Sequence, residues 1–385
     1  MAEAAGRQVL AWLRAREQEM TELLAQLVLA ESPSLVPGSE KAGLSILTRE
    51  LEEAGLLTRR LRGDETGAHL FARPRDRRRH SGYQLVLGHV DTVWPLGSVR
   101  SMSPRRDNGR FFGPGAYDMK GGLVQLVFAL RALHELVLRP RLAPVVLVNS
   151  DEEIGSLDSR RHIRRIARSA ARAFVLEPPA APAGSLKTSR KGVERFEIVV
   201  KGRAAHAGSR PEEGVSAILE LSHQVQRLFA LSDPEHGVTV NVGTIDGGLR
   251  ANVVAPEATA LVDVRTPTEA SARAVARAIQ SLEPARPGTT ITVRRDARRP
   301  PMRATGRNRA LLHRARRLGQ ELDIRIDEAP LVGGASDANL TSGLTATLDG
   351  LGAVGDGAHA PDEYVVVSAL PERAALLALL LLEDP

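Results

Sequence analysis

The sequence contains no cysteine, which excludes disulfide bridges, thiolate metal sites and a cysteine nucleophile. Any metal ion would therefore be held by histidines and carboxylates. Aromatic residues make up only 3% of the 385 residues, so leucine, valine and alanine must fill the core. No apolar run has the length of a membrane span. The longest, at residues 370–382, contains Glu372 and Arg373, and we expect it to be a buried helix.

Basic residues exceed acidic ones, with a net charge of +6 and a pI of about 10.1. The basic patches interleaved with aromatics that favour nucleic-acid binding are missing, so we expect neither a nucleic-acid nor a membrane partner. The one tight basic run, at residues 73–80, is predicted to be a solvated loop. The positive field would favour an anionic substrate. The first twenty residues lack the apolar core of a signal peptide, which predicts a cytoplasmic protein.

Buried strands alternate with helical patterns in the first half of the chain, which predicts an α/β fold with a mostly parallel sheet flanked by helices. Continuous apolar strands are predicted at residues 83–87, 145–148 and 173–176. Further predictions are helices at 7–31, 39–54, 122–136 and 156–171, paired strands at 57–62 and 68–72, a loop at 94–110, and strands at 324–326 and 346–348. In such a sheet, ligands bind at the carboxyl ends of the strands.

The pattern changes after residue 183 to strand, helix, two strands, helix and strand. These elements are predicted at residues 193–201, 214–229, 238–242, 258–264, 269–282 and 289–293. This order is that of a ferredoxin-like α+β domain. We therefore predict an inserted domain at residues 184–300 within a catalytic domain formed by residues 1–183 and 301–385.

Histidines and carboxylates follow the ends of the predicted strands. They are His89, Asp91, Asp118, Glu152, Glu153, Glu177 and, in a later loop, His359. Each motif alone is more often structural than functional, but their joint placement on one rim of one sheet favours a metal site. A nitrogen and oxygen ligand set suits zinc, cobalt or manganese. In the His-x-Asp pair, the carboxylate can accept the second imidazole N–H and fix the ring.

Six motifs, in order over nearly the whole chain, resemble those of the cocatalytic zinc exopeptidases and deacylases. The motifs are GHVDTV, GPGAYDMKGG, SDEEIGS, GRAAHAG, GGASDA and GDGAHAPDEYV. This family includes glutamate carboxypeptidase, acetylornithine deacetylase, succinyl-diaminopimelate desuccinylase and aminoacylase. The segments around GGASDAN and GDGAHAPDEYV most resemble the glutamate carboxypeptidase-like branch.

The resemblance implies a site with two zinc ions and a role for each residue. Asp118 would bridge both ions and form a cis peptide bond with Met119. His89 and Glu177 would complete one ion's ligand set, and Glu153 and His359 the other's. Asp91 would orient His89, and Glu152 would be the general base.

The resemblance also assigns roles within the inserted domain, which in this family forms the dimer. His206 would reach the partner subunit's active site and stabilise the oxyanion. Asn252 and Arg265 would contact substrate, and Arg299 would hold its carboxylate, a task that suits a guanidinium. The loop at residues 333–337, with Gly334, would shape the pocket floor.

Three functions follow from these observations. The first is a carboxypeptidase that hydrolyses the amide next to a free carboxylate and releases C-terminal Glu or a related residue. The second is an N-acyl-amino-acid deacylase or dipeptidase with the same machinery, acting on a small-molecule substrate. The third is a non-catalytic metal-binding or partner-binding relative, against which the retention of every ligand and of Glu152 argues.

Overall fold

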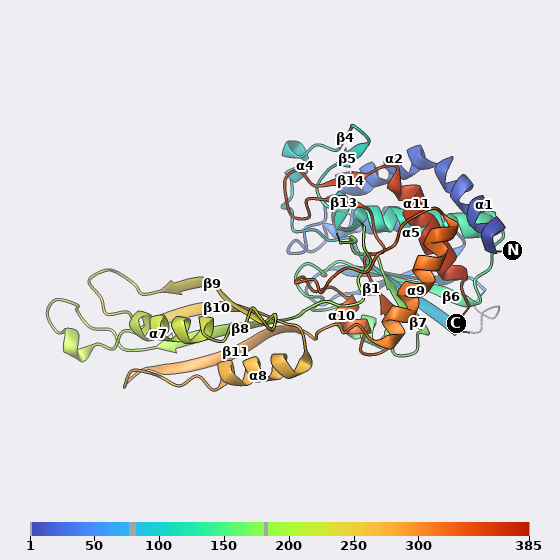
Figure 1. Cartoon of the computed structure of the whole chain (residues 1–385). Coiled ribbons are helices and arrows are strands. Elements are labelled where there is room, and N and C mark those ends of the chain that lie inside the picture. The colour runs from blue at the N-terminus through green and yellow to red at the C-terminus, as the bar shows by residue number, and fades with distance from the viewer. Residues whose placement is uncertain (1, 77–81, 181–183, 385) are drawn as a thin grey trace. The chain divides into compact units, whose positions relative to one another are not determined.

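A computed structural model describes residues 2–76, 82–180 and 184–384 (Figure 1). The chain forms two compact units. The first comprises Met1–Thr188, Ala304–Pro330 and Ser336–Pro385, and the second comprises Ser189–Arg303 and Leu331–Ala335. The predicted boundary at residue 183 falls on a residue outside the described ranges. The chain also crosses between the units at residues 330–336, a segment that the sequence placed in the catalytic domain.

A six-stranded mixed sheet forms the centre of the first unit, in the order β1-β2-β6-β3-β7-β12. Its strands are β1 (Leu56–Arg62), β2 (Ala68–Pro74), β3 (Gly82–His89), β6 (Leu142–Asn149), β7 (Arg172–Val175) and β12 (Ala346–Leu348). The strands β6, β3, β7 and β12 run parallel to one another, and β1 and β2 form an antiparallel edge. The three predicted apolar strands are thus neighbours at the middle of the sheet, where both faces are covered.

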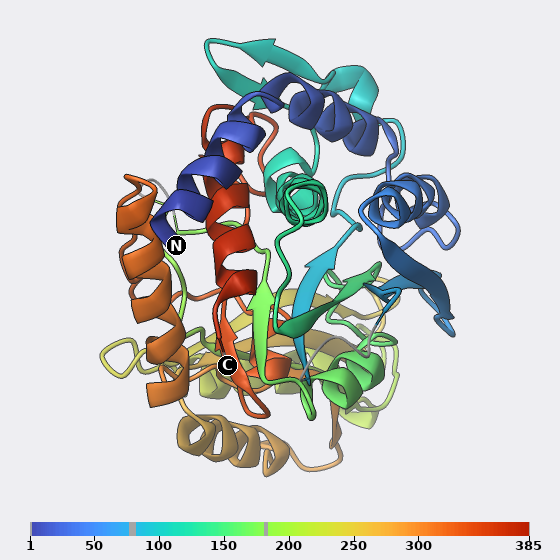
Figure 2. The same cartoon turned by 90° about the vertical axis from the view of Figure 1, so that its right-hand side faces the viewer.

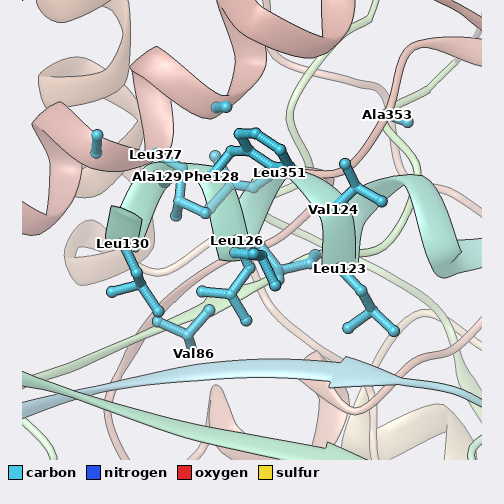
Figure 3. Packing of buried hydrophobic residues seen from close by; sticks show 14 of the residues in the cluster. Val86, Leu123, Val124, Leu126, Phe128, Ala129, Leu130, Leu351, Ala353 and Leu377 are labelled. Atoms are coloured by element: carbon cyan, nitrogen blue, oxygen red, sulfur yellow. The ribbon is translucent and has the colours of Figure 1, made fainter. Parts of the chain in front are cut away.

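Helices flank this sheet, and α5 (Gly121–Glu135) is the most deeply buried of those that contact it. Figure 3 shows Leu123, Leu126 and Leu130 pointing toward the sheet, while Phe128 lies on the opposite side of the helix near Leu377. A helix that is apolar all round is stable only inside a core. The apolar α5 therefore fixes the loop before it, which carries Asp118, against the centre of the sheet.

The remaining long helices of the first unit pack against α5 or against one of its neighbours. They are α1 (Ala2–Arg14), α2 (Glu17–Leu29), α3 (Glu40–Glu53), α9 (Gly306–Glu321) and α11 (Ala369–Leu382). Figure 2 shows α1 and α11 side by side, which brings the two ends of the chain into one layer. The apolar run at 370–382 is confirmed as a buried helix. Within the described ranges, no helix has the length and apolar character needed to cross a bilayer.

The second unit has the ferredoxin-like order that the sequence predicts. Its elements are β8 (Gly192–Lys201), α7 (Ala217–Phe229), β9 (Thr239–Gly247), β10 (Glu257–Thr266), α8 (Glu269–Gln280) and β11 (Thr290–Arg299). The antiparallel sheet has the order β11-β8-β10-β9. Side-chain caps define where both helices begin: Ser216 accepts the N–H of Leu219, and Thr268 and Ser271 form a capping box.

Several predicted elements differ from the structure. The segment at 94–110 is not a plain loop: it contains α4 (Ser98–Ser101) and β4 (Arg105–Asp107), which pairs with β5 (Arg110–Phe112). These strands join β13 (Gly355–Asp356) and β14 (Tyr364–Val366) in a third sheet. Patterns among neighbouring residues of the sequence do not reveal this third sheet, because its strands have only two or three residues each.

Other predicted elements were wrong in extent or absent. The helix predicted at 7–31 is two helices, interrupted between Arg14 and Glu17. The helix predicted at 156–171 is only α6 (Arg160–Ala167), because the carboxylate of Asp151 accepts the N–H groups of Asp158 and Ser159 and holds that segment as a turn. Residues 324–326 form no strand. The basic run at 73–80 lies partly outside the described ranges, which omit residues 77–80.

Candidate metal centre

The candidate ligands gather at the carboxyl ends of three neighbouring parallel strands. His89 is the last residue of β3, Glu152 and Glu153 follow β6, and Glu177 follows β7. Asp118 lies in a distorted helical turn (η2, Ala116–Lys120) directly before α5. The carboxyl ends of parallel strands meet at one edge of a sheet, so residues distant in sequence converge there.

Asp118 directs one oxygen toward each of two imidazoles. Its Oδ1 lies 3.3 Å from Nε2 of His89, and its Oδ2 lies 3.6 Å from Nε2 of His359. Nε2 of His359 is also 3.3 Å from Oε2 of Glu153, and Nε2 of His89 is 3.7 Å from Oε1 of Glu177. The five predicted ligands therefore form two groups that share Asp118.

Candidate ligand atoms come close enough to hold an ion in two clusters, which share His89 and do not include His359. Those of His89, Asp118 and Glu153 all lie within 4.8 Å of one another, as do those of His89, Glu152 and Glu177. Among the residues that the structure describes, Nε2 of His89, Oδ1 of Asp118 and Oε1 of Glu153 are buried and make no hydrogen bond. Buried polar atoms are normally hydrogen-bonded, and such a set of nitrogen and oxygen atoms fits a divalent cation.

The proton affinities of the ligands reflect this crowding. Burial tends to lower the pKa of His89, but its contacts with the carboxylates of Asp118 and Asp91 raise the pKa well above its usual value. Burial raises the pKa of Glu153 to about 7, and the hydrogen bond to Glu153 raises the pKa of His359 to about 9. Without metal, protons thus occupy positions among the ligands, and metal binding at such groups releases protons.

His359 has an unusual backbone for a histidine. Its φ is +62°, in the left-handed region that few residues other than glycine adopt. Its side chain is 51% exposed, whereas that of His89 is almost fully buried. The strained backbone turns the imidazole toward Glu153 and Asp118, and strain of this kind concentrates at functional sites.

Close backbone approaches explain the glycines on both sides of Asp118. Gly115 has φ +71°, and a Cβ there would lie 2.4 Å from Cγ2 of Thr92. A Cβ on Gly122 would lie 2.4 Å from the carbonyl oxygen of Leu176, the residue before Glu177. The Asp118–Met119 peptide bond is cis, as the resemblance implies.

Asp91 contacts His89 through its main chain more closely than through its side chain. Nδ1 of His89 is 2.9 Å from the Asp91 carbonyl oxygen and 3.5 Å from its Oδ1. The carboxylate accepts the hydroxyl of Ser34 at 2.7 Å and the N–H groups of Glu152 and Glu153 at 3.2 and 3.1 Å. The orienting role stays a prediction, and the side chain also holds the loop of the two glutamates.

Sequence reasoning missed three residues beside the ligands: Ser34, Trp94 and Glu363. The carboxylate of Glu363 accepts hydrogen bonds from Trp94 and from the backbone around Asp118. A signal was present, because Glu363 stands four residues after His359 inside the motif GDGAHAPDEYV. Nothing local marks Ser34, whose contact with Asp91 joins loops 57 residues apart.

The predicted substrate contacts all lie in the second unit. His206 and Asn252 are exposed neighbours, since the Asn252 carbonyl accepts the N–H of Ala207. Nδ1 of His206 accepts the N–H groups of Gly208 and Ser209, both at 3.1 Å. An acceptor role for Nδ1 places the proton of the neutral ring on Nε2, which is then a hydrogen-bond donor.

A second group in that unit contains Arg265, Gly334 and Arg299. The guanidinium of Arg265 forms a two-point contact with Asp263 at 2.6 and 3.0 Å. The carbonyl of Gly334 accepts a hydrogen bond from Arg190 at 3.1 Å. Arg299 is largely buried at the end of β11, opposite Val193 of β8. These three residues are distant in sequence from the turn of His206 and belong to other elements. Their roles stay predictions.

A model of peptidase family M20/M25/M40 matches residues 85–383. The chain belongs to this family. It is 29% identical over 304 residues to carboxypeptidase G2 from Pseudomonas sp. strain RS-16, an alignment covering 78% of this chain and 73% of that protein. It is 35% identical over 205 residues to a probable carboxypeptidase from Aspergillus terreus, covering 48% and 46%.

Solved structures of low sequence identity share the whole fold. Aminopeptidase PepT from Bacillus cereus superposes with a TM-score of 0.73 at 20% identity, covering 95% of this chain and 98% of that one. The M20 metallo-carboxypeptidase Sso-CP2 from Sulfolobus solfataricus has a TM-score of 0.71 at 15% identity, covering 95% and 98%. YXEP from Bacillus subtilis, a dinuclear metal-binding M20 peptidase, has 0.69 at 17%, covering 96% and 98%.

Membership of this family confirms the predicted resemblance and the predicted enzyme class. The protein is a metallopeptidase-family hydrolase that acts on peptide bonds, with carboxypeptidases among its homologues. The non-catalytic alternative is not supported.

Proposed function

We propose that this enzyme uses two zinc ions to hydrolyse the amide next to a free carboxylate, and that it releases C-terminal Glu or a related residue. The observation that carries the proposal is the position of Asp118, with one oxygen near His89 and the other near His359. Its carboxypeptidase relatives favour this direction of cleavage. Cobalt or manganese would suit the same oxygen and nitrogen ligands.

The ions would be held in two overlapping sets. His89, Asp118 and Glu177 would hold one, and Asp118, Glu153 and His359 the other. When bound, a pair of such ions would polarise a carbonyl and lower the pKa of a water to about 7. Both sets combine imidazole and carboxylate, and their shared member has its two oxygens turned to different histidines.

Glu152 is the proposed general base. Its carboxylate lies beside His89 and Glu177, and its backbone N–H is bound by Asp91. It would accept a proton from the attacking water and pass it to the leaving amine. Glu153, held by the same Asp91 carboxylate, is directed instead at His359. One anchored loop thus supplies a base and a ligand from adjacent residues.

Substrate recognition is assigned to the second unit. Arg299 would bind the free carboxylate, with Arg265, Asn252 and the loop of Gly334 as further contacts. His206 would donate from Nε2 to the oxyanion, a use consistent with the acceptor role of its Nδ1. The net charge of +6 would also attract an anionic substrate.

We also propose a cytoplasmic homodimer formed through the second unit, with His206 serving the partner's site. The strand β9 is an edge of its sheet and leaves Ile245 exposed. Leu249 follows it, and Ile218 on α7, which is 46% exposed, lies against Gly248. Exposed edges and apolar side chains of this kind favour association. Light scattering on the wild type and on Ile218→Glu tests this: the wild type should be dimeric and the variant shifted toward monomer.

The decisive experiment is a panel of N-acyl amino acids and short peptides varied at the C-terminal residue, assayed with chelator and with added zinc. The proposal expects chelator-sensitive release of the C-terminal residue and a preference for Glu. Broad activity on acyl amino acids, or on dipeptides alone, would replace it with the deacylase or dipeptidase alternative. Activity that survives full metal removal would contradict both.

A further inference from the structure

One buried carboxylate outside the ligand set contacts the backbone that carries Asp118. Oε1 of Glu363 accepts the N–H groups of Tyr117 at 2.8 Å and Asp118 at 2.9 Å. Its Oε2 accepts the N–H of Gly115 at 2.8 Å and the indole N–H of Trp94 at 3.1 Å. Glu363 is only 1% exposed, so these four donors replace its contact with water.

These contacts connect three of the segments that bear candidate ligands. Gly115, Tyr117 and Asp118 belong to the turn of the shared carboxylate. Trp94 lies three residues after Asp91, in the segment that begins with His89, and Glu363 itself lies four residues after His359. A main-chain bond from the Gly113 N–H to the Glu363 carbonyl, at 3.3 Å, adds to the contact.

The chemistry of the contact requires a carboxylate rather than an amide. Four N–H donors point at the two oxygens, and an ionised carboxylate has acceptor sites for all of them. In Glu363→Gln one oxygen becomes an NH₂ group, which would face two donors without accepting from either. The backbone N–H groups left unpaired in a buried site would then favour rotation of the turn that holds Asp118.

We propose that Glu363 is the positioning residue of the metal centre: it holds the Asp118 turn so that both carboxylate oxygens face their imidazoles. The inference rests on the proposed two-ion site. It follows that losing this carboxylate weakens both ions together, because the residue it positions is the one they share. Outer-shell partners of metal ligands typically contribute about 10- to 100-fold in metal affinity.

The test measures metal affinity in the purified full-length protein, independently of activity. Metal-free wild type, Glu363→Gln and Trp94→Phe are titrated with Zn²⁺ against a competing chelator, and with Co²⁺ while its visible spectrum is recorded. Glu363→Gln should bind both ions about 10- to 100-fold more weakly, with an altered cobalt spectrum. Trp94→Phe keeps an aromatic side chain but removes the indole N–H donor, and should bind both ions several-fold more weakly.

The matched control is Glu220→Gln in the second unit. Glu220 is another fully buried glutamate that accepts backbone N–H groups, from Ala285 and Arg286 at 2.9 and 2.8 Å, and none of its contacts is a candidate ligand. Its variant should lose stability but bind metal as the wild type does. An equal loss of affinity in this control would mean that general destabilisation explains the effect, and would overturn the inference.

The proposal would also be overturned if Glu363→Gln is folded, as verified by circular dichroism, and binds both ions with wild-type affinity. If that variant does not fold, Trp94→Phe decides: a several-fold loss supports the inference and unchanged affinity refutes it. Failure of the underlying function is recognised separately, because the wild type itself would then bind fewer than two ions.

Discussion

Replacing Asp118 with asparagine should remove both metal ions at once, whereas truncating His359 should remove one. The substitution keeps the shape of the side chain, so the turn before α5 can stay folded. An amide offers one carbonyl oxygen and one NH₂ group, and the NH₂ cannot be a ligand. Since Oδ1 faces His89 and Oδ2 faces His359, one of the two groups loses its shared anion completely, and the other keeps only a neutral oxygen.

The expected size follows from linkage between binding and folding. At free metal about 100 times the dissociation constant, one bound ion adds about 2.7 kcal/mol to the free energy of unfolding, and two independent ions about twice that. Chelator should therefore destabilise the wild type by roughly 5 kcal/mol and His359→Ala by about half as much. Asp118→Asn should show almost no change. Denaturant unfolding with and without chelator measures each difference, and atomic absorption counts the bound ions.

The control is His134→Ala, which changes a histidine on α5 that lies beside Gly55 rather than among the ligands. It should bind two ions and respond to chelator as the wild type does. The reasoning would be refuted by Asp118→Asn protein that retains one ion per chain at wild-type affinity, because a shared ligand cannot be removed from one ion alone. Equal ion counts in Asp118→Asn and His359→Ala would refute it as well.

Three further predictions concern the base, a glycine and the core. Glu152→Gln should lower kcat by about a hundred- to ten-thousand-fold while two ions remain bound, whereas Glu153→Gln should lose an ion; the reverse pattern would exchange their roles. Gly122→Ala should lower both the free energy of unfolding and the metal affinity. The added Cβ would lie 2.4 Å from the Leu176 carbonyl oxygen and would displace the segment of Glu177. A metal affinity equal to that of the wild type would contradict this coupling. Phe128→Ala should cost about 3–5 kcal/mol in denaturant unfolding without changing the number of bound ions, and a smaller loss would mean that the core around α5 refills the cavity.

The convergence of the candidate ligands could be predicted from the sequence because parallel strands follow a simple geometric rule. Apolar runs identified β3, β6 and β7, and adjacent parallel strands end at the same rim. Polar residues immediately after those runs must then lie close together, whatever the conformation of the loops between them. The strands of the second unit could also be predicted from the sequence. Successive residues of β8 and of β10 alternate between a buried and an accessible face.

The parts that escaped prediction depend on contacts between distant backbone segments. The strands β4, β5, β13 and β14 are two or three residues long, too short for a periodic pattern, and β5 pairs with β14 across more than 250 residues of sequence. The role of Glu363 depends on N–H groups about 245 residues earlier. A glutamate that accepts backbone hydrogen bonds and one that is a candidate ligand look the same in the sequence.

The carboxylates at this rim therefore divide into two kinds that only the structure separates. Asp91 and Glu363 are buried and satisfied by N–H and O–H donors, so each already has the hydrogen bonds that replace hydration. Within the described ranges, Asp118 and Glu153 each have one buried oxygen that makes no hydrogen bond, and both carboxylates face imidazoles. A cation should bind preferentially to the second kind, because there it compensates the charge of the carboxylate. At the first kind it would have to compete with backbone donors. The first kind holds the second in place, so metal affinity in this enzyme should depend on residues that never contact a metal ion.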